Sequence, residues 1–407
     1  MKLNWVSADN VKCSLWRLVT NWLTLLVALL LILEGSAAIF FHTMKPHFLF
    51  YELEKFTISL EQIRGQNSIF DADLGWLKHF NTKFGERPTL FGDFPPGITV
   101  FGDSFAHGDN VSDAEVWTEH LAAALGRRVI NLGVDGYGMD QSLLRFEKHF
   151  FKARAPIVLL EFISENINRN MNVYRKFYFL PTGIPMTKPR FEIEHGQLKL
   201  IPNPIRTIRD RDQLSDVNAL RRIGEHDWWY NRMNLPVFGF PYTGILLNRS
   251  FWHQIMKVFR RQPSDIDGAP QLDLWEFPEP VELSFAIMNR FCDEARAQGV
   301  VPLIVHFPSQ YEVREFRRIR AIPISAAKTK VECEKHEWNC LFPVFEADLI
   351  FPEATEAYFT KSRHYNARGN AAMAKWLFDH IDGRFPVRCT PVATSDADNP
   401  DCLYRRQ

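Results

Sequence analysis

A serine that directly follows an apolar run carries the strongest chemical signal in this chain. Residues 98–101 read Ile-Thr-Val-Phe, and Gly102, Asp103 and Ser104 come next. This pattern predicts a buried strand that breaks into a tight turn, which places the Ser104 hydroxyl at the carboxyl end of a sheet. Backbone N–H groups at such a turn have no strand partner. A serine there is either a turn residue or a nucleophile, and residues further along the chain decide between the two.

A nucleophilic serine needs a general base and hydrogen-bond donors for the oxyanion that develops during the reaction. The candidate base is His364, which stands just before the last amphipathic stretch. Residues 131–136 end the second predicted strand in a glycine-rich turn, where a backbone N–H can approach a ligand closely. A further donor is an amide side chain in residues 162–166, after the third predicted strand. Because open parallel sheets bind ligands at the carboxyl ends of their strands, these segments are expected to form one site.

The elements that position these residues alternate between strands and helices. We expect, in chain order, strand 97–101, helix 115–126, strand 128–132, helix 139–153, strand 157–160, helix 279–298, strand 300–305 and helix 366–382. The run 157–160 is apolar throughout, which is typical of a strand covered on both faces. Such alternation predicts an α/β fold with a parallel sheet and right-handed crossovers.

The regular pattern is interrupted between about 168 and 280, which we interpret as one long insertion into the α/β domain. Within it, residues 190–201 alternate around His195 and Gly196 and predict a hairpin. We place the main domain at 46–385 and an irregular tail at 386–407, where Ser, Asp, Asn and Pro are frequent.

One segment stands apart from the globular fold. Residues 18–41 are almost entirely apolar, with Glu34 as the single charge, and as a helix they would extend about 36 Å. That length spans a membrane, and the excess of cationic residues in 1–17 predicts a cytoplasmic tail and an exported body. The alternative is a signal peptide cleaved near residues 36–38, which read Ser-Ala-Ala. Apolar residues continue beyond that point, which favours an uncleaved anchor.

Composition excludes some classes of function. The 407 residues include 48 Lys plus Arg and 48 Asp plus Glu, so no basic excess exists for binding nucleic acid. The cysteines show no spacing typical of zinc ligands, so we expect no metal site. Cys333 with Cys340 and Cys389 with Cys402 are close enough in sequence to form disulfides in an oxidising compartment. Cys292 is expected to be a buried free thiol.

Taken together, the motifs resemble the SGNH hydrolases, also called the GDSL type. Gly102-Asp103-Ser104, the segment 131–138 and the pattern His364-x-Asn366-x-x-Gly369 occur in order, and the resemblance covers residues 97–167 and 281–382. It implies a three-layer α/β/α, flavodoxin-like domain that needs no cofactor. It also implies roles for particular residues: Ser104 as nucleophile, His364 as general base, and the backbone N–H groups of Ser104 and Gly136 with the Asn166 side chain as the oxyanion hole.

Two positions depart from the family pattern. The family usually carries Asp two or three residues before its catalytic histidine, whereas this chain has Ser362 and Lys361 there. The group that orients His364 is therefore open. Either a backbone carbonyl or one of the acids Glu161, Glu165, Glu353 and Glu356 takes this role, or turnover is slow. The third motif reads Glu165-Asn166 where the family usually has Asn-Asp. The asparagine of this chain is therefore one position later than the family's oxyanion asparagine, which leaves its alignment open. Asp103 is expected to support the turn through backbone hydrogen bonds, and Glu165 is kept as a second supporting residue.

The resulting interpretation is a serine ester hydrolase anchored in a bacterial inner membrane with its main domain in the periplasm. The expected substrate is an ester-bearing small molecule or O-acylated carbohydrate of the envelope. An O-acyltransferase with the same serine and histidine is one alternative, in which a sugar hydroxyl replaces water. A non-catalytic glycan-binding or scaffold protein is another, motivated by the missing acid.

Overall fold

The computed structural model describes residues 8–44, 53–66, 69–78, 80, 82–233, 240–247, 252 and 273–382. The chain divides into two compact units. One comprises Met1–Phe56 and Trp229–Pro263, and the other comprises Thr57–Trp228 and Ser264–Gln407. All the residues expected to do chemistry therefore belong to the second unit.

A five-stranded parallel sheet forms the centre of the second unit, in the order β4-β3-β5-β8-β9. The strands are β3 (Pro96–Phe101), β4 (Arg128–Asn131), β5 (Ile157–Phe162), β8 (Val301–His306) and β9 (Cys340–Leu341). In β3, Ile98 pairs with Ile157 and Phe101 with Leu160 of β5. This register brings the carboxyl ends of β3, β4 and β5 to one edge of the sheet, as the apolar runs predict.

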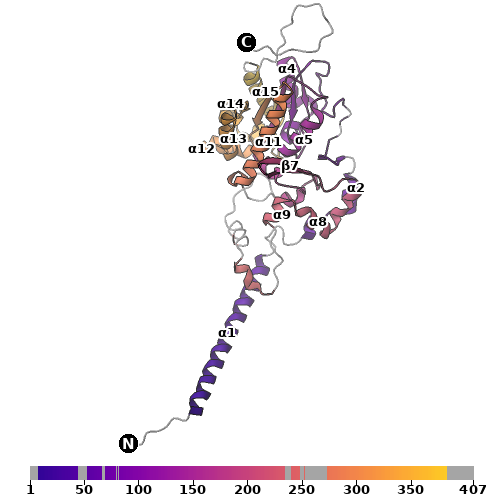
Figure 1. Cartoon of the computed structure of the whole chain (residues 1–407). Coiled ribbons are helices and arrows are strands. Elements are labelled where there is room, and N and C mark those ends of the chain that lie inside the picture. The colour runs from indigo at the N-terminus through magenta and orange to yellow at the C-terminus, as the bar shows by residue number, and fades with distance from the viewer. Residues whose placement is uncertain are drawn as a thin grey trace, which may run out of the picture. The chain divides into compact units, whose positions relative to one another are not determined.

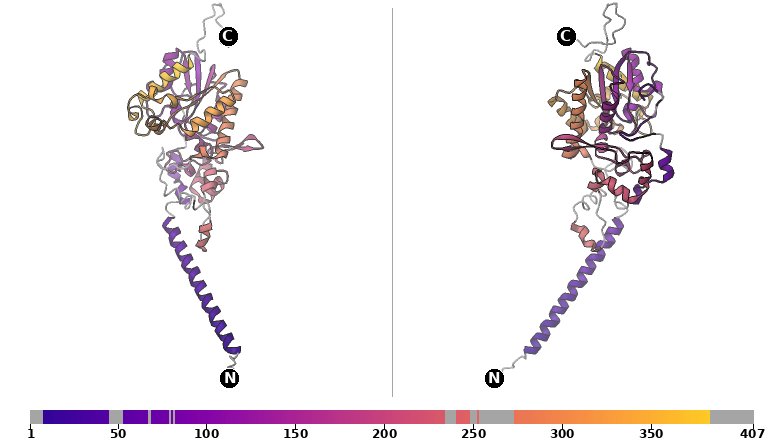
Figure 2. Two further views of the ribbon diagram at one scale, coloured as in Figure 1. Left: turned by 90° about the vertical axis from the view of Figure 1, so that its left-hand side faces the viewer. Right: turned by 45° about the vertical axis from the view of Figure 1, so that its right-hand side comes forward.

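Helices cover both faces of this sheet, so the unit has three layers (Figures 1 and 2). Ile98 and Val100 of β3 share one buried cluster with residues of α4 (Trp117–Leu125), α12 (Gln310–Ile319) and α15 (Ala367–Ile381). Phe101 points to the other face, where its ring lies 5.6 Å from that of Phe146 in α5 (Met139–His149). Phe146 in turn packs against Phe291 of α11 (Pro278–Ala297). Because successive side chains of β3 point to opposite faces, this strand contributes apolar residues to the hydrophobic core on each side of the sheet.

The predicted elements agree with this structure to within a few residues at their ends. The hairpin predicted at 190–201 is formed by β6 (Arg190–Glu194) and β7 (Gln197–Ile201). β9 was not predicted, because a strand of two residues carries no periodic signal. The other described helices and short strands are α2 (Leu60–Gly65), β1 (Phe70–Asp71), β2 (Gly75–Trp76), α3 (Ser104–His107), α6 (Asn166–Asn170), α7 (Arg175–Tyr178), α8 (Val217–Gly224), α9 (Trp228–Met233), α13 (Ile324–Lys335) and α14 (Ala347–Ile350).

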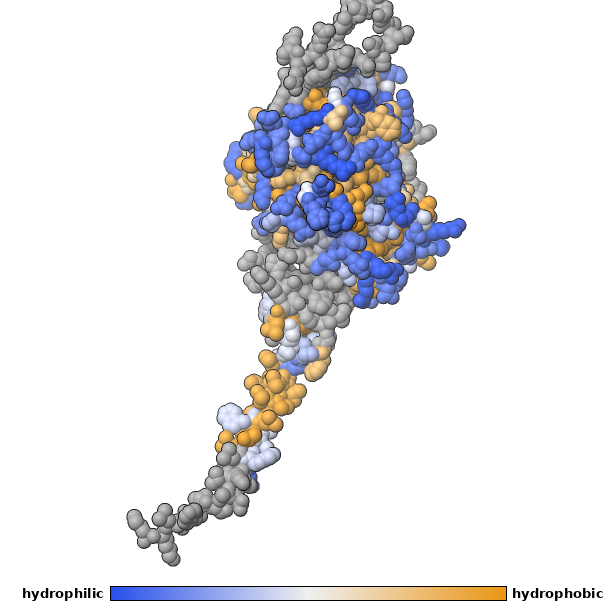
Figure 3. Space-filling model, in the orientation of Figure 1, coloured by the Kyte–Doolittle hydropathy of each residue, from blue (hydrophilic) through white to orange (hydrophobic). Residues whose placement is uncertain are grey.

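In the first unit, α1 (Ala8–Met44) contains a stretch, Trp16–Thr43, that is long and apolar enough to cross a membrane. Figure 3 shows apolar residues along this helix. Its one acidic side chain in that stretch, Glu34, accepts the backbone N–H of Thr243 at 3.0 Å and that of Tyr242. Phe41 packs against the ring of Tyr242 at 5.8 Å. A signal sequence has the same length and composition, so the helix is an anchor or a leader.

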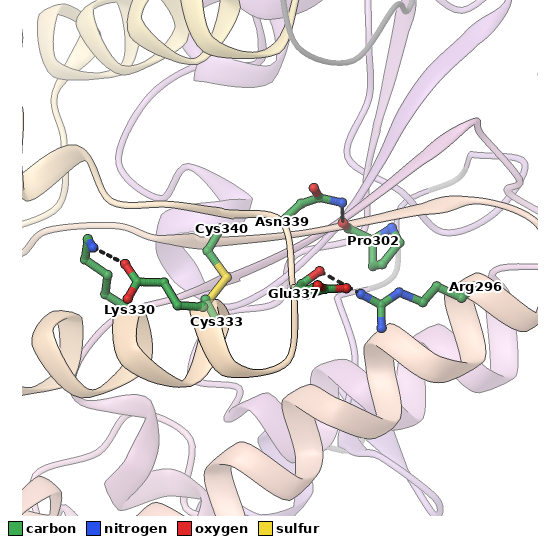
Figure 4. Close-up of a disulfide and its surroundings, with 8 residues drawn as sticks. Arg296, Pro302, Lys330, Cys333, Glu337, Asn339 and Cys340 are labelled. Carbon is green, nitrogen blue, oxygen red and sulfur yellow. Dashed lines mark hydrogen bonds and ion pairs between the residues drawn. A yellow bond between two sulfur atoms is a disulfide. The ribbon is translucent and has the colours of Figure 1, made fainter. Parts of the chain in front are cut away.

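A disulfide joins Cys333 of α13 to Cys340 of β9 (Figure 4), which confirms the pairing expected from the sequence. It closes a short loop, and beside it Asn339 donates from Nδ2 to the Pro302 carbonyl at 3.1 Å. Closing a loop of this size stabilises a fold by about 2.5 kcal/mol in the chain-entropy model. The bond therefore ties the short edge strand to a helix. Cys292 is buried and free, also as expected, while Cys389, Cys402 and the tail 386–407 lie outside the described residues.

Candidate active site

Ser104 is held at the end of β3 by the turn that the sequence predicts. Asp103 is the N-cap of α3, and its Oδ1 accepts the backbone N–H of Phe105 at 2.7 Å. Gly102 lies against the Glu161 carboxylate, because a Cβ built on this glycine would meet Glu161 Oε2 at 2.4 Å. Only glycine therefore lets β3 turn this close to β5 and leave the Ser104 hydroxyl at the sheet edge.

The structure brings Ser104 and His364 together from positions 260 residues apart. His364 Nε2 lies 2.9 Å from Ser104 Oγ, which is hydrogen-bonding distance. His364 stands in the loop before α15, where Thr360 donates its backbone N–H to the His364 carbonyl at 2.8 Å. This loop also contains Arg363 in the left-handed region, at φ 67°. The expected pair of hydroxyl and imidazole is thus formed.

The other nitrogen of His364 contacts Asn110, which the sequence analysis did not single out. His364 Nδ1 lies 2.8 Å from Asn110 Oδ1, and the Ser362 hydroxyl donates to the same oxygen at 2.7 Å. Because a carbonyl oxygen only accepts, Nδ1 carries the hydrogen and Nε2 is left to accept the Ser104 proton. Asn110 has φ 71°, a conformation that Asn adopts more readily than most residues.

The groups considered from the sequence for this role lie elsewhere, so that expectation is corrected. Each of the four acids has its own partner among the described residues: Glu165 with Arg169, Glu353 with Arg368, Glu356 with Arg314, and Glu161 with the backbone of Asp103. The partner of Nδ1 is not a backbone carbonyl either. The group that faces Nδ1 is thus the neutral amide of Asn110.

The loop that carries Asn110 is fixed by a buried arginine. Arg87 donates from Nη1 to the carbonyls of His107 and Gly108, both at 2.6 Å, and from Nη2 to the carbonyl of Val111 at 2.7 Å. Its Nε also binds Asp113 at 2.8 Å. These bonds surround Asn110 on both sides in the chain. The loop conformation, and with it the position of Oδ1, therefore depends on Arg87.

Gly136 is in the turn after β4, next to Asp135, which lines the same cavity as Ser104, and it has φ 77°. Both peptide groups next to it are held by side chains. The Asp135 carbonyl accepts Trp76 Nε1–H at 2.9 Å, and the Gly136 carbonyl accepts Arg175 Nη1–H at 2.7 Å. Because the Gly136 N–H belongs to the same peptide group as the Asp135 carbonyl, Trp76 sets its direction. Among the hydrogen bonds of the described residues, the backbone N–H groups of Ser104 and Gly136 have no acceptor.

Asn166 is placed beneath the site and does not line the cavity. Its Nδ2 donates to Asp103 Oδ2 at 2.9 Å and to the Tyr137 carbonyl at 3.1 Å, so both amide hydrogens have acceptors. Arg169 Nη1 makes the same two contacts, each at 2.9 Å. In this arrangement Asn166 supports the turn through Asp103, and the donors that remain for an oxyanion are the two backbone N–H groups.

Glu161, on β5, forms a buried acidic pair with Asp103. Glu161 Oε2 accepts the Asp103 backbone N–H at 3.1 Å, and both side chains are about 1 % exposed. Burial, followed by the negative charge of Asp103, raises the pKa of the Glu161 carboxyl well above its ordinary value of 4.5. Burial and the neighbouring charge thus favour the protonated form of Glu161, while Arg169 balances the charge of Asp103.

This pairing predicts how stability depends on pH. Because the pKa of Glu161 is higher in the folded chain than in the unfolded chain, the folded state loses stability as pH rises above 4.5, by at most about 1.4 kcal/mol per pH unit. Glu161→Gln has the shape of the protonated acid and removes this loss. We expect the free energy of unfolding of this variant to exceed that of the wild type by a margin that grows as pH rises from 4.5 toward the raised pKa of Glu161, measured by urea unfolding at a series of pH values. The exposed Glu282→Gln is the matched control, and an advantage that shrinks as pH rises would contradict the prediction.

A cavity of about 440 Å³ opens above the Ser104 and His364 pair. Its apolar wall contains Phe105, Ile163, Phe179, Ile184 and Tyr311. Its charged lining comprises Asp135, Glu165, Arg169, Arg175, Lys361 and Arg363. The volume is in the range of cavities that bind small molecules, and the reacting groups face it.

A second contact between a serine and a histidine occurs nearby. Ser164 Oγ lies 3.1 Å from His306 Nε2, and Ser164 also contacts Glu312 and Ser325. His306 is completely buried, and its Nδ1 has no partner among the described residues. The Glu312 carboxylate approaches Nε2 instead, at 3.7 Å. An orienting group on the far nitrogen is what a general base requires, and it is present at His364 and absent at His306.

Comparison with solved structures finds chains with similar folds at low identity. A member of the lipolytic G-D-S-L family from Veillonella parvula is 12% identical, and the match covers 70% of this chain and 97% of that chain with a TM-score of 0.33. An alpha/beta hydrolase enzyme from the metagenome of Lake Arreo in Spain is 11% identical, with 71% and 97% covered and a TM-score of 0.34. No family model and no curated protein sequence matches this chain. Function is therefore inferred from the geometry of the site itself.

Proposed function

We propose that the chain is a serine ester hydrolase of SGNH type, with Ser104 as nucleophile and His364 as general base. The observation that carries this proposal is the chain of contacts Ser104 Oγ, His364 Nε2, His364 Nδ1 and Asn110 Oδ1, with distances of 2.9 and 2.8 Å, at a cavity. This is the arrangement of nucleophile, base and orienting group that acyl transfer requires.

The mechanism follows from these positions. Ser104 Oγ attacks the ester carbonyl while His364 Nε2 takes its proton, and the backbone N–H groups of Ser104 and Gly136 bind the resulting oxyanion. The imidazolium then gives the proton to the leaving alcohol, and the acyl group stays on Ser104. Water, deprotonated by His364, attacks the acyl-enzyme and releases the acid. No metal or organic cofactor takes part in these steps.

Asn110 orients the imidazole but adds no negative charge. In papain-like proteases an asparagine holds the catalytic histidine in the same way, so an amide is sufficient for orientation. The imidazolium that forms in the transition state gains less stabilisation from an amide than from a carboxylate. A slower enzyme than one with an aspartate at this position is therefore expected.

We further propose that α1 anchors the chain in a bacterial inner membrane, with the sheet unit in the periplasm and with O-acylated carbohydrate of the envelope as substrate. The length and composition of Trp16–Thr43 support the anchor. The disulfide between Cys333 and Cys340 supports an oxidising compartment. Sequencing of the N-terminus of the membrane-bound protein distinguishes an anchor from a cleaved leader, because cleavage near residues 36–38 would remove the helix.

The proposed activity is tested with a fluorophosphonate probe on the full chain in detergent. We expect the probe to modify Ser104, identified by mass spectrometry of peptides, and O-acetylated oligosaccharides to release acetate. Modification of Ser164 would overturn the assignment of the nucleophile. The absence of both labelling and acetate release would favour a non-catalytic binding protein. Acetyl groups that move to an added sugar hydroxyl, instead of appearing as acetate, would identify a transferase with the same pair of residues.

A further inference from the structure

Arg175 occupies an unusual place for a cation. It begins α7, in the segment that interrupts the predicted α/β pattern, and its side chain lies against the turn at Gly136. A Cβ built on Gly136 would meet Arg175 Cζ at 2.9 Å, so the glycine leaves room for the guanidinium to lie flat on the backbone. Arg175 is only 8 % exposed and yet lines the cavity above Ser104. A cation is thus held next to the proposed oxyanion donor.

The hydrogen bonds of Arg175 leave part of its guanidinium for a ligand. Nε donates to Thr182 Oγ1 at 2.9 Å, and Nη1 donates to the Gly136 carbonyl at 2.7 Å. These bonds fix the plane of the group. Among the described residues, Arg175 forms no ion pair with a carboxylate within 4.0 Å, and its Nη2 donates to no protein acceptor. Burying a cation without a carboxylate partner has an unfavourable free energy of desolvation. The two N–H groups on Nη2 can offset it by donating hydrogen bonds to an anion.

The neighbouring Arg169, unlike Arg175, forms ion pairs with carboxylates of this site. It binds Asp103 Oδ2 at 2.9 Å and Glu165 Oε2 at 3.1 Å, so two carboxylates share one guanidinium. Glu165 also accepts a hydrogen bond from the Tyr178 hydroxyl. Neither carboxylate makes an ion pair with Arg175. Burial, followed by the positive charge of Arg169, lowers the pKa of Arg175, and the carboxylates of Asp135 and Glu165 offset this lowering only in part.

The remaining charges around the cavity also favour an anion. Lys361 and Arg363 line it from the loop that carries His364, and Asp135 lines it from the Gly136 turn. Arg169 is shared by Asp103 and Glu165. The described lining therefore holds three further cations, Arg175, Lys361 and Arg363, together with the carboxylates of Asp135 and Glu165. Arg363 is held in this lining by a turn in which its φ is 67°, an uncommon conformation for arginine.

We propose that Arg175 binds an anionic group of the substrate, so that the natural ester belongs to a molecule carrying a carboxylate or a phosphate close to the acyl group. The inference rests on the proposed ester hydrolysis at Ser104 and names the chemistry that selects its substrate. The two N–H groups of Nη2 can donate to the oxygens of a carboxylate or phosphate, in hydrogen bonds strengthened by the opposite charges. The fixed plane of the guanidinium beside Gly136 would set the distance between that anion and the reacting carbonyl, which makes Arg175 a specificity-determining residue.

The test compares esters that differ only in the anion. The carboxylate probe is O-acetylated methyl glucuronoside, its neutral match is the methyl ester of the same sugar, and the phosphate probe is O-acetylated glucose 6-phosphate. We expect kcat/KM of the wild type to be at least about 10-fold higher for one anionic probe than for the neutral one, mainly through KM. The probe with the higher value identifies the anion. Equal values for the anionic and neutral probes would overturn the proposal.

Variants of Arg175 separate binding from mere support of the Gly136 turn. Arg175→Gln removes the charge and is expected to raise KM for the preferred anionic probe about 10- to 100-fold more than KM for the neutral ester. Loss of the hydrogen bond to the Gly136 carbonyl is expected to lower kcat equally on both esters, so the difference in KM reports the anion alone. Arg175→Lys keeps the charge but not the planar guanidinium that is fixed by Thr182 and Gly136, so an intermediate KM is expected. The exposed Arg221→Gln is the matched control. An equal change of KM on the anionic and neutral probes, with any loss confined to kcat, would assign Arg175 to positioning the oxyanion donor and overturn anion binding.

A measurement on the wild type covers the case in which Arg175→Gln does not fold. Methyl glucuronoside, glucose 6-phosphate and methyl glucoside are tested for protection of Ser104 against the fluorophosphonate probe. Protection by an anionic sugar at a concentration at least about 10-fold lower than by methyl glucoside supports the proposal, and equal protection overturns it. Failure of the probe to label unprotected Ser104 would instead count against the proposed function.

Discussion

Ser104→Ala is expected to lower kcat for ester hydrolysis by about 10⁴- to 10⁶-fold. Loss of the Oγ nucleophile removes the acyl-enzyme route, and only the catalysis supplied by the oxyanion donors and by substrate binding remains. The measurement is acetate release under saturating substrate, together with labelling by the fluorophosphonate probe, which should disappear. Thermal unfolding should be close to that of the wild type, because the change removes one hydroxyl at the cavity surface.

Two further variants make this result specific. His364→Gln is expected to cost nearly as much as Ser104→Ala, and the double variant little more than either, because the two residues act as one unit. Ser164→Ala should retain labelling at Ser104, since Ser164 contacts His306 and not His364. Independent, multiplicative losses for Ser104 and His364 would mean that the hydrogen bond between them does not serve catalysis.

Asn110→Ala is expected to lower kcat by about 10²- to 10⁴-fold, the upper value being the cost of disabling the orienting acid in a serine protease. The variant removes the acceptor for His364 Nδ1–H at 2.8 Å, so the imidazole loses its fixed tautomer and orientation. It also places alanine at φ 71°, which adds backbone strain. Steady-state kinetics give the loss in rate, and urea unfolding gives the part due to stability.

Asn110→Asp is expected to change activity in the opposite direction. Aspartate accepts the same hydrogen bonds, tolerates the left-handed conformation and adds a negative charge that stabilises the imidazolium. We expect kcat at neutral pH to rise above the wild-type value. The exposed Asn218→Asp makes the same change in net charge away from the site and should leave kcat unaltered. A lower kcat for Asn110→Asp, with stability preserved, would contradict the orienting role of the Asn110 carbonyl.

Much of the fold follows from local patterns. β3, β4, β5 and β8 are apolar runs long enough to be recognised, and α5, α11 and α15 show helical periodicity. β9 carries no such signal, because two residues gain strand geometry only from pairing with β8 and from the disulfide at Cys340. The membership of residues 229–263 in the unit of the N-terminal helix was also not visible, since it depends on contacts distant in sequence.

The groups that hold Gly136 could not be predicted from the sequence. Trp76 and Arg175 hold the two peptide groups that flank this glycine, and they come from positions far from it in the chain. Trp76 stands in a conspicuous aromatic segment, but its indole N–H has a role only once the segment packs against the turn after β4. No spacing rule connects an indole with a carbonyl 59 residues away.

By itself, the sequence determined that one serine follows a strand in a tight turn and that one histidine precedes the last helix, because turn chemistry and apolar periodicity act over a few residues. Only the tertiary structure decided what faces the far nitrogen of that histidine. Asn110 reaches it across 254 residues because Arg87 holds its loop and because asparagine accepts a positive φ. Contacts of this kind arise when distant loops meet at one sheet edge, and no local pattern encodes which side chains will meet there.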